Sequence, residues 1–405
     1  MKSSKVVKKS MAKINTDQAK INELLTRGVT EVIERGELEK ALLSGKKLRV
    51  KLGFDPTGDN IHIGRAIVLR KLRDFQRLGH KVVFLVGDFT ARIGDPSDKL
   101  SKRPMLSKER IKENLKTYKK QVGKIIDLRQ AEFRFNSQWL KKLGFEEIAQ
   151  LAESFTVQQM LARRNFKNRF EKGEEISVRE MMYPLMQGYD SVALKADVEL
   201  GGSDQLFNLT AGRTIQRHYN QNPQNVLTVE MLEGTDGRKM STSWGNVVNI
   251  VEEPSEMFGK IMSVKDELVE KYFLLCTDFS QTEIKAILQE QEPKERKIIL
   301  AKAIVALYHS EEDAQKAAAE FNRIFGQGSL PSEIEEITIS QEKMTALDLV
   351  FETKLVESRG EARRIIEQGG VKINEEKVKD GSKEIKIEDG LIVQIGKRRW
   401  VKIKK

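Results

Sequence analysis

The chain has little cysteine and no long apolar run, and each absence excludes a class of protein. Cys276 is its single cysteine, so an internal disulfide and a zinc site built on several cysteines are both excluded. No stretch approaches the ~18 consecutive apolar residues of a membrane span. Four lysines lie in the first ten residues without an apolar segment after them, so we expect no signal peptide. These features predict a cytoplasmic protein with no membrane contact.

Positive charge is in excess. The 405 residues include 71 Lys and Arg against 60 Asp and Glu, a net charge of +11, which indicates a polyanionic partner. At roughly 100–200 residues per domain, the length predicts two to four domains. The four histidines, His62, His80, His218 and His309, lack a metal-ligand spacing, so no protein-bound metal is predicted.

The hydrophobic pattern between residues 48 and 86 predicts a βαβ unit. Residues 48–54 alternate between apolar and polar and predict a strand. An apolar stripe over 63–78 predicts a helix that Gly79 ends. The continuous apolar run at 82–86 is typical of a strand buried on both faces. A parallel sheet follows from this order.

The rest of the chain carries similar signals. Residues 14–43 predict one or two amphipathic helices, and 197–202 and 224–232 predict further buried strands. From about 254 to 325 the pattern is helical. The last 60 residues predict a separate unit of one helix and short strands, in which 371–405 carry 11 basic and 6 acidic residues, 11 − 6 = +5.

Three segments carry candidate chemistry. DPTGDNIHIGR covers a strand-to-helix turn that favours phosphate, where His62 adds a donor and Gly64 permits close approach. GRKMSTS places Arg238 and Lys239 on a glycine-hinged loop that suits a triphosphate. LGGSDQLFN ends a strand, where Asp204 suits a ribose. Taken alone, each segment is more typical of an ordinary structural turn or surface loop.

Taken together, the three segments resemble the class I aminoacyl-tRNA synthetases, and specifically the bacterial-type tyrosyl-tRNA synthetases. The resemblance extends over nearly the whole chain, through GFDPT, FLVGDFTARIGDPS, YPLMQGYD, GGSDQLFN, LEGTDGRKMSTS and SRGEARRIIEQGGVKIN. It implies an α/β fold: a Rossmann-like parallel-sheet catalytic domain, then an α-helical domain and a small α+β S4-like RNA-binding domain. The implied bounds are 1–235 for N-terminal helices and the catalytic domain with a dimerisation insertion at about 126–180, 236–250 for the KMSTS loop, 251–328 for an anticodon-binding domain, 329–342 for a linker and 343–405 for the S4-like domain.

The same resemblance implies a tyrosine–tRNA ligase. Such an enzyme activates L-tyrosine with Mg-ATP to tyrosyl-adenylate and then transfers tyrosyl to the 3′-terminal ribose of tRNA(Tyr). The residues implied for catalysis are His62, Gly64, Arg65, Thr90, Lys239 and Thr242. Those implied for tyrosine binding are Asp55, Asp95, Tyr183, Gln187, Asp190 and Gln205. Those implied for ATP binding, with Mg²⁺ accompanying the nucleotide, are Gly53, His62, Gly64, Gly202, Asp204 and Lys239.

The residues themselves support tyrosine as the amino acid. Tyr183, Gln187 and Asp190 fall at i, i+4 and i+7, on one face of a helix. A buried carboxylate needs a partner, and a phenol hydroxyl would satisfy Asp190, whereas phenylalanine would leave it unpaired. The alternative is that Asp190 caps a helix or pairs with a nearby basic residue.

The C-terminal segment is suited to RNA. Clustered cations beside an aromatic side chain are typical of surfaces that bind phosphates and stack on unpaired bases. The alternative is a solvated basic face. The candidate RNA-binding residues are Arg359, Arg363, Arg364, Lys397, Arg398 and Arg399, next to Trp400.

Three positions depart from the family pattern. The HIGH tetrad ends in Arg65, the second lysine of KMSKS is Thr242, and Lys51 replaces a tyrosine that contacts the substrate hydroxyl in many members. We expect Arg65 either to donate to a phosphate or to turn away, and Arg238 to replace part of the lost charge. Activation is expected to be slower or differently balanced.

Other readings stay open. A tryptophanyl-tRNA synthetase shares the fold, although Gln187 and Asp190 argue against it, and a non-catalytic RNA-binding paralogue would explain Arg65 and Thr242. The absence of a G-x-G-x-x-G after a strand argues against a nicotinamide enzyme. The resemblance implies a homodimer, for which an exposed apolar patch is expected from Phe133, Phe135, Trp139, Leu143 and Phe145.

Overall fold

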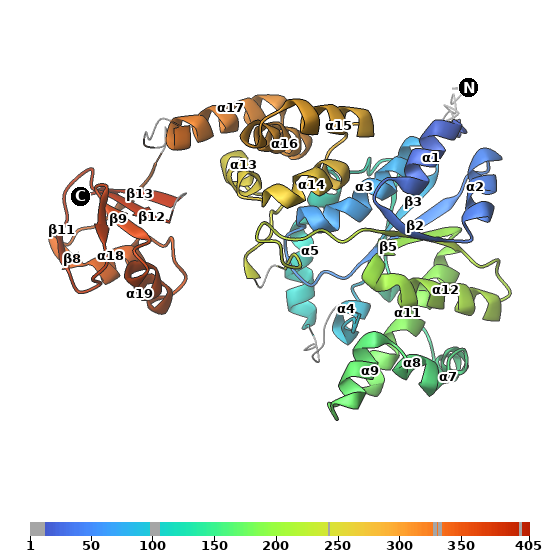
Figure 1. The fold of residues 1–405 in the computed structure, drawn as a ribbon. Coiled ribbons are helices and arrows are strands. Elements are labelled where there is room, and N and C mark those ends of the chain that lie inside the picture. Colours follow the sequence, from blue (N-terminus) through green and yellow to red (C-terminus); the bar gives the residue numbers. More distant parts are fainter. Residues whose placement is uncertain (1–12, 98–105, 242–243, 327–329, 331–333, 397–398) are drawn as a thin grey trace, which may run out of the picture. The chain divides into compact units, whose positions relative to one another are not determined.

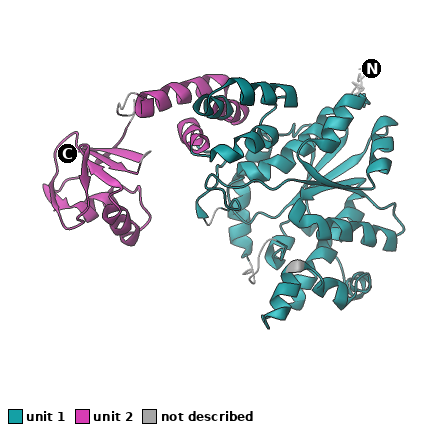
Figure 2. Ribbon diagram, in the orientation of Figure 1, with its two compact units in different colours: residues 1–252, 263–300 teal, residues 253–262, 301–405 magenta. Residues whose placement is uncertain are grey.

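The computed structural model describes residues 13–97, 106–241, 244–326, 330, 334–396 and 399–405 (Figure 1). The chain divides into two compact units (Figure 2). The first comprises residues 1–252 and 263–300, and the second 253–262 and 301–405. Among the helices described, none has the length and apolar character needed to cross a membrane.

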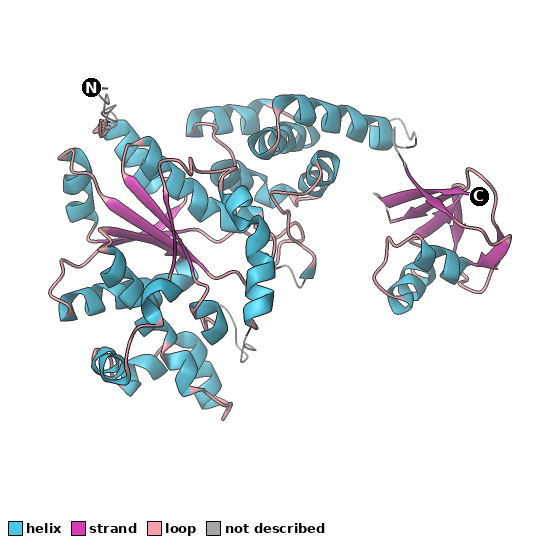
Figure 3. Ribbon diagram, turned by 180° about the vertical axis from the view of Figure 1, so that it is seen from behind, coloured by secondary structure: helices cyan, strands magenta, loops and turns pink. Residues whose placement is uncertain are grey.

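A six-stranded sheet forms the centre of the first unit, with helices around it (Figure 3). The strand order is β1-β6-β5-β2-β3-β4, in which β1 pairs antiparallel with β6 and all other neighbours are parallel. The parallel βαβ unit predicted from the sequence is confirmed. The strands are β1 Val29–Ile33, β2 Arg49–Phe54, β3 Lys81–Val86, β4 Glu132–Phe135, β5 Val198–Gly202 and β6 Asn225–Val229.

Helices cover both faces of this sheet. In Figure 1, α3 lies on one face and α11 and α12 lie on the other. The apolar stripe of α3 is buried against β2, β3 and β5. The helices are α1 Gln18–Thr26, α2 Arg35–Leu43, α3 Ile63–Arg77, α4 Thr90–Ile93, α5 Lys108–Val122, α6 Ser137–Leu140, α7 Phe145–Glu153, α8 Val157–Leu161, α9 Arg164–Glu171, α10 Val178–Met181, α11 Tyr183–Leu194, α12 Leu206–His218, α14 Val269–Cys276 and α15 Gln281–Glu290, with 3₁₀ turns Ser203–Gln205 and Asp266–Leu268.

The strand order reverses next to β2. From β2 the chain proceeds outward to β3 and β4, and it then returns to the other side of β2 to form β5 and β6. In an open parallel sheet, ligands bind beyond the carboxyl ends of the strands at such a reversal. The segments that follow β2, β3, β4 and β5 therefore meet at one edge.

Two strands of the six-stranded sheet were not expected from the sequence. Residues 14–43 contain β1 between α1 and α2, so the prediction of helices alone was wrong for Val29–Ile33. This segment is rich in β-branched residues and pairs with β6, where the hydroxyls of Thr30 and Thr228 lie 2.7 Å apart. The second strand, β4, was also missed, because its four half-buried residues are too few for a clear alternation.

The second unit combines helices with a small β domain. It holds α13 Pro254–Met262, α17 Glu311–Phe321 and a π-helical turn Asn322–Gly326, while α16 Pro293–Tyr308 runs across the boundary in sequence. The β domain has a five-stranded sheet of order β10-β9-β12-β13-β7, a two-stranded sheet β11-β8 and two helices, one more than the sequence predicted. Strand β7 lies within the segment 329–342 that was expected to be a linker. Their bounds are β7 Glu335–Thr338, β8 Lys343–Thr345, α18 Ala346–Glu352, α19 Arg359–Glu367, β9 Val371–Ile373, β10 Glu376–Val378, β11 Glu384–Lys386, β12 Ile392–Ile395 and β13 Arg399–Lys404.

Candidate active site

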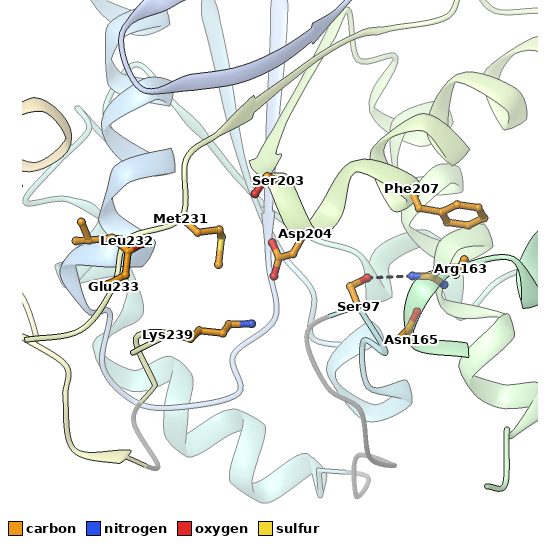
Figure 4. A pocket seen from close by; sticks show the side chains of 10 residues that line it. All are labelled: Ser97, Arg163, Asn165, Ser203, Asp204, Phe207, Met231, Leu232, Glu233 and Lys239. Atoms are coloured by element: carbon orange, nitrogen blue, oxygen red, sulfur yellow. Dashed lines mark hydrogen bonds between the residues drawn. The ribbon is translucent and has the colours of Figure 1, made fainter. Parts of the chain in front are cut away.

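A cavity of about 560 Å³ opens at the carboxyl ends of the strands, in the first unit. It contains two of the predicted residues, Asp204 from the turn after β5 and Lys239 from the KMSTS loop. Figure 4 shows both side chains directed toward the cavity, which Arg163 approaches from another side. The lining residues are Ser97, Arg163, Asn165, Ser203, Asp204, Phe207, Met231, Leu232, Glu233 and Lys239.

The HIGR segment lies directly against the KMSTS loop. The amide of Ile63 donates to the carbonyl of Val248 at 2.8 Å. A Cβ at Gly64 would lie only 3.0 Å from the sulfur of Met240, so a side chain there would press on the loop. Gly64 therefore lets the start of α3 and the loop approach each other closely.

His62 caps the N-terminus of α3. Its Nδ1 accepts the amide of Arg65 at 3.3 Å. Burial, and secondly the positive Arg65, lower the pKa of His62 to about 3, so the imidazole is neutral. Because Nδ1 accepts, the proton of the neutral ring lies on Nε2, which is a donor next to the positive end of a helix dipole.

Arg65 is held at the GFDPT turn. Its guanidinium donates to the hydroxyl of Thr57 at 2.9 Å and to that of Tyr118 at 3.3 Å, and it lies over the ring of Phe54. These contacts hold the guanidinium against the GFDPT turn and α5, and Arg65 is not among the residues that line the cavity.

The KMSTS loop is folded around Asn246. Its amide donates to Asp236 at 2.8 Å and to the carbonyl of Lys239 at 3.1 Å. Arg238 is bonded to Asp236 at 2.6 Å and lies over the ring of Trp244, so its charge is engaged inside the loop. Arg238 is not among the residues that line the cavity. Thr242 lies outside the described residues.

A hydrogen-bonded chain links five side chains at the ends of β2, β3 and β4 and on α11. Tyr183 and Thr90 donate to the two oxygens of Asp55, at 3.0 and 2.7 Å. Asn136, directly after β4, donates to Thr90 at 3.0 Å and to Asp190 at 3.2 Å. Predicted residues far apart in sequence are thus brought together, with Asn136 as a link that the sequence did not indicate.

Asp190 is buried, and its carboxylate can accept further hydrogen bonds. Trp139 Nε1 donates to one of its oxygens at 2.7 Å, and Asn136 donates to the other. Burial raises the pKa of Asp190 to about 7, although the positive Lys51 opposes this shift. The carboxylate oxygens can each accept one more hydrogen bond, so a phenol hydroxyl remains a suitable partner. Asp190 neither caps a helix nor pairs directly with a cation among the contacts of the described residues.

A second polar cluster surrounds Asp95. Gln205 donates to this carboxylate at 2.7 Å and Asn208 at 3.3 Å. Arg163 donates to Asn208 and to Ser97, each at 3.0 Å. Burial lowers the pKa of Arg163 to about 10, where it is still charged at neutral pH, so it makes this part of the cavity wall positive.

The remaining ATP candidates lie at two strand ends. Gly53, near the end of β2, is exposed. At Gly202, the last residue of β5, a Cβ would lie 2.8 Å from Asp204 Oδ1 and 3.1 Å from the sulfur of Met231, so a side chain would crowd these two residues.

The candidate RNA-binding residues belong to the second unit. Arg363 and Arg364 are exposed on α19, whereas Arg359 is bonded to Asp348 at 2.9 Å. Arg399 donates to the carbonyl of Leu355. Lys397 and Arg398 lie outside the described residues.

The expected apolar patch differs from the observed surface. Phe145 is 89% exposed, but its four expected neighbours are half-buried, so the prediction of an exposed patch from these residues was wrong. Trp139 packs on β3 and α11 because its indole bonds to Asp190. The exposed apolar residues of this segment are Phe145, Val157, Phe170 and Val178.

The strand reversal, the start of α3 and the loop that carries Lys239 lie at one edge of the sheet, and both acidic and basic side chains line the cavity there. The family model described as "tRNA synthetases class I (W and Y)" matches residues 43–326, and that of the "S4 domain" matches 347–391. The chain belongs to the class I tRNA synthetases, and its relatives place it in the tyrosine–tRNA ligase family.

These relatives are similar over almost their full length. The tyrosine–tRNA ligase of Aquifex aeolicus is 47% identical over 381 residues, which cover 94% of this chain and 97% of that ligase. The Thermotoga maritima ligase is 45% identical over 387 residues, covering 94% and 96%. Among solved structures, a truncated mitochondrial tyrosyl-tRNA synthetase of Coccidioides posadasii has a TM-score of 0.62 at 25% identity, covering 75% of this chain and 92% of that one.

The close packing at the end of β3 generates a stability prediction. A methyl group at Gly87 would overlap Asp55 Oδ1 and Thr90 Oγ1. We therefore expect Gly87→Ala to lower the free energy of unfolding by about 1–3 kcal/mol, as overpacking does. Gly58→Ala is the control, because a Cβ there meets nothing within 4 Å, and its effect should stay within about 0.5 kcal/mol. Urea unfolding measures both, and equal effects would contradict the prediction.

Proposed function

We propose that this chain is a tyrosine–tRNA ligase that activates L-tyrosine with ATP and transfers it to tRNA(Tyr). Two features at the same sheet edge support the proposal. The first is the buried Asp190, whose carboxylate can accept further hydrogen bonds, and the second is the cavity that Asp204 and Lys239 line. The first suits a phenol, and the second suits a nucleotide.

In the first step, the tyrosine carboxylate attacks the α-phosphorus of ATP and pyrophosphate leaves. Lys239 and the start of α3 with His62 Nε2–H would receive the phosphates, while Asp204 would bind the ribose. Such chemistry depends on positioning and charge stabilisation, for which a fixed donor set is sufficient. Mg²⁺ would enter with ATP. No cluster of three metal-ligating side chains occurs in the part of the chain that the structure describes.

The amino-acid end would hold tyrosine at both polar groups. Asp190 would accept the phenol hydroxyl, and Tyr183, Gln187 and Asp95 would surround the ammonium. Burial and the nearby Asp55 and Asp95 carboxylates raise the pKa of Tyr183, so its hydroxyl is protonated and donates to Asp55. Its oxygen lone pairs can still accept a hydrogen bond from an ammonium.

In the second step, a ribose hydroxyl at the 3′ end of tRNA takes the tyrosyl group from AMP. We propose that the exposed cations of the S4 domain, Arg363 and Arg364 first, hold the RNA phosphates.

We also propose a homodimer through the exposed apolar side chains Phe145, Val157, Phe170 and Val178. A cytoplasmic location fits the single, buried cysteine.

Amino-acid-dependent ATP–pyrophosphate exchange tests the activity. We expect tyrosine to support exchange, and tryptophan and phenylalanine to support it at least 10³-fold less, because neither donates a phenol hydroxyl to Asp190. Exchange with tryptophan would favour a tryptophanyl-tRNA synthetase. Absence of exchange with all three, in a folded protein that still binds tRNA, would favour the RNA-binding paralogue.

The raised pKa of Asp190 predicts a pH dependence of tyrosine binding. The folded protein holds a proton on this group up to about pH 7, well above the ordinary value of an aspartate. Below pH 7 the protonated carboxyl is a poorer acceptor, so the Kd for tyrosine should rise by up to about tenfold per pH unit and level off above pH 7. Equilibrium dialysis from pH 5.5 to 8.5 measures this. The Kd for phenylalanine should stay constant, and a parallel rise would contradict the assignment.

The exposed cations of the S4 domain, Arg363 and Arg364, predict a salt dependence of tRNA binding. Arg363→Gln with Arg364→Gln should weaken tRNA binding and reduce the slope of log K against log[salt] by about 1–2, since each lost phosphate contact removes roughly 0.7–0.9. Exchange without tRNA should be unchanged. Lys386→Gln is the control, because Lys386 is bonded to Glu388 at 2.8 Å. An unchanged slope in the double variant would exclude these arginines from the RNA surface.

A further inference from the structure

Lys51 is fully buried in the first unit, at 0% exposure, and all three of its donors are used. Its Nζ lies 2.9 Å from the carbonyl of Gln187, 2.9 Å from the hydroxyl of Ser191 and 2.9 Å from Glu199 Oε1. The first two acceptors belong to α11 and the third to β5. Lys51 on β2 therefore joins the neighbouring strand to the helix that carries the amino-acid residues.

Glu199 is the counter-charge of Lys51, and it is 1% exposed. Oε1 accepts from Lys51 and from Gln187 Nε2, the latter at 3.0 Å. Oε2 accepts from Ser191 at 2.9 Å and from Gln224 at 2.5 Å. An ionised carboxylate with four donors and a cation as one of them is satisfied in spite of its burial.

This arrangement determines which way the amide of Gln187 points. An amide group carries an acceptor oxygen and a donor nitrogen, and it can be turned by 180° unless its neighbours discriminate between them. Glu199 can only accept, so Nε2 must face it. Gln187 Oε1 is then directed away from Glu199 and is left to accept from another group. The hydrogen bond from Lys51 Nζ to the backbone carbonyl of Gln187 fixes the backbone of Gln187 as well.

We propose that Lys51 and Glu199 are positioning residues that orient Gln187 so that its amide oxygen accepts the ammonium group of the amino-acid substrate. The inference rests on the proposed function, since it assigns the ammonium to the site that contains Gln187. Lys51, which replaces a tyrosine of many family members, would then act by orienting Gln187 and not by contacting the substrate hydroxyl.

The charges themselves are necessary for this role. A neutral amide at position 199 can donate as well as accept, so it would hold Gln187 equally well in either orientation. A carboxylate discriminates, but a buried carboxylate needs a cation, and Lys51 is the cation that the described contacts supply. The same positive charge also opposes protonation of the nearby Asp190.

Two substitutions separate orientation from charge. Glu199→Gln removes the discrimination but leaves Lys51 with a buried, unpaired charge and can destabilise the fold. Lys51→Met combined with Glu199→Met removes both charges together at similar volume, which is often neutral for stability. In each variant Gln187 is free to turn its amide.

Two ligands probe the two ends of the amino acid. Tyrosinol carries the phenol and the ammonium without a carboxylate, and 3-(4-hydroxyphenyl)propionate carries the phenol and a carboxylate without the ammonium. We expect the Kd of tyrosinol to rise at least tenfold in both variants, whereas the Kd of the propionate should change less than twofold. A merely structural role would weaken both ligands alike. In a Gln187→Leu background, Glu199→Gln should cause no further loss of tyrosinol affinity.

The matched control is Glu180→Gln. Arg169 and Glu180 form another buried ion pair in the first unit, at 2.8 Å with both side chains 3% exposed, and neither is bonded to Gln187. This variant should leave both ligand affinities unchanged. Equal losses for the two ligands at positions 51 and 199, or no loss at all, would overturn the inference. The proposed function is tested separately, because it fails only if the unaltered protein shows no tyrosine-dependent exchange.

Discussion

The burial of carboxylates beneath the cleft is the constraint on which the structure of the site depends. Asp190 and Glu199 are buried and Asp55 is half-buried, and each accepts at least two hydrogen bonds from side chains. Leaving a buried acceptor unmatched costs about 1–3 kcal/mol, and more when it is charged. The donors that prevent this cost, such as Asn136 and Trp139, therefore determine the shape of the amino-acid end.

The proposed nucleotide end of the site follows a different principle. Here the backbone supplies much of the positive electrostatic potential, because α3 begins directly after its N-cap His62 and the helix dipole favours anions. Gly64 and Gly202 keep this region open, since a side chain at either position would press on Met240 or Asp204. The loop that carries Lys239 is fastened internally by Asn246, so the lysine is presented from a folded turn.

Much of this organisation can be recognised before the structure is known. The βαβ unit follows from periodicity over residues 48–86, and three short segments indicate the family because their residue types and order are specific. The spacing of Tyr183, Gln187 and Asp190 predicts a shared helix face, and α11 carries all three. The predictions that failed concern single elements. Strand β1, for example, was missed because its pairing with β6 outweighs the helical pattern around it.

The amino-acid sequence by itself determined the family and the parallel sheet, and it indicated which residues to propose for the site, because these depend on local order and residue type. The tertiary structure alone decided the partners of those residues. Trp139 reads as an apolar surface residue and Lys51 as an unusual substitution, yet one holds Asp190 and the other neutralises Glu199. Trp139 and Asp190 are separated by 51 positions in the sequence, and Lys51 and Glu199 by 148. Sequence periodicity does not indicate contacts that form only when strands and helices pack together.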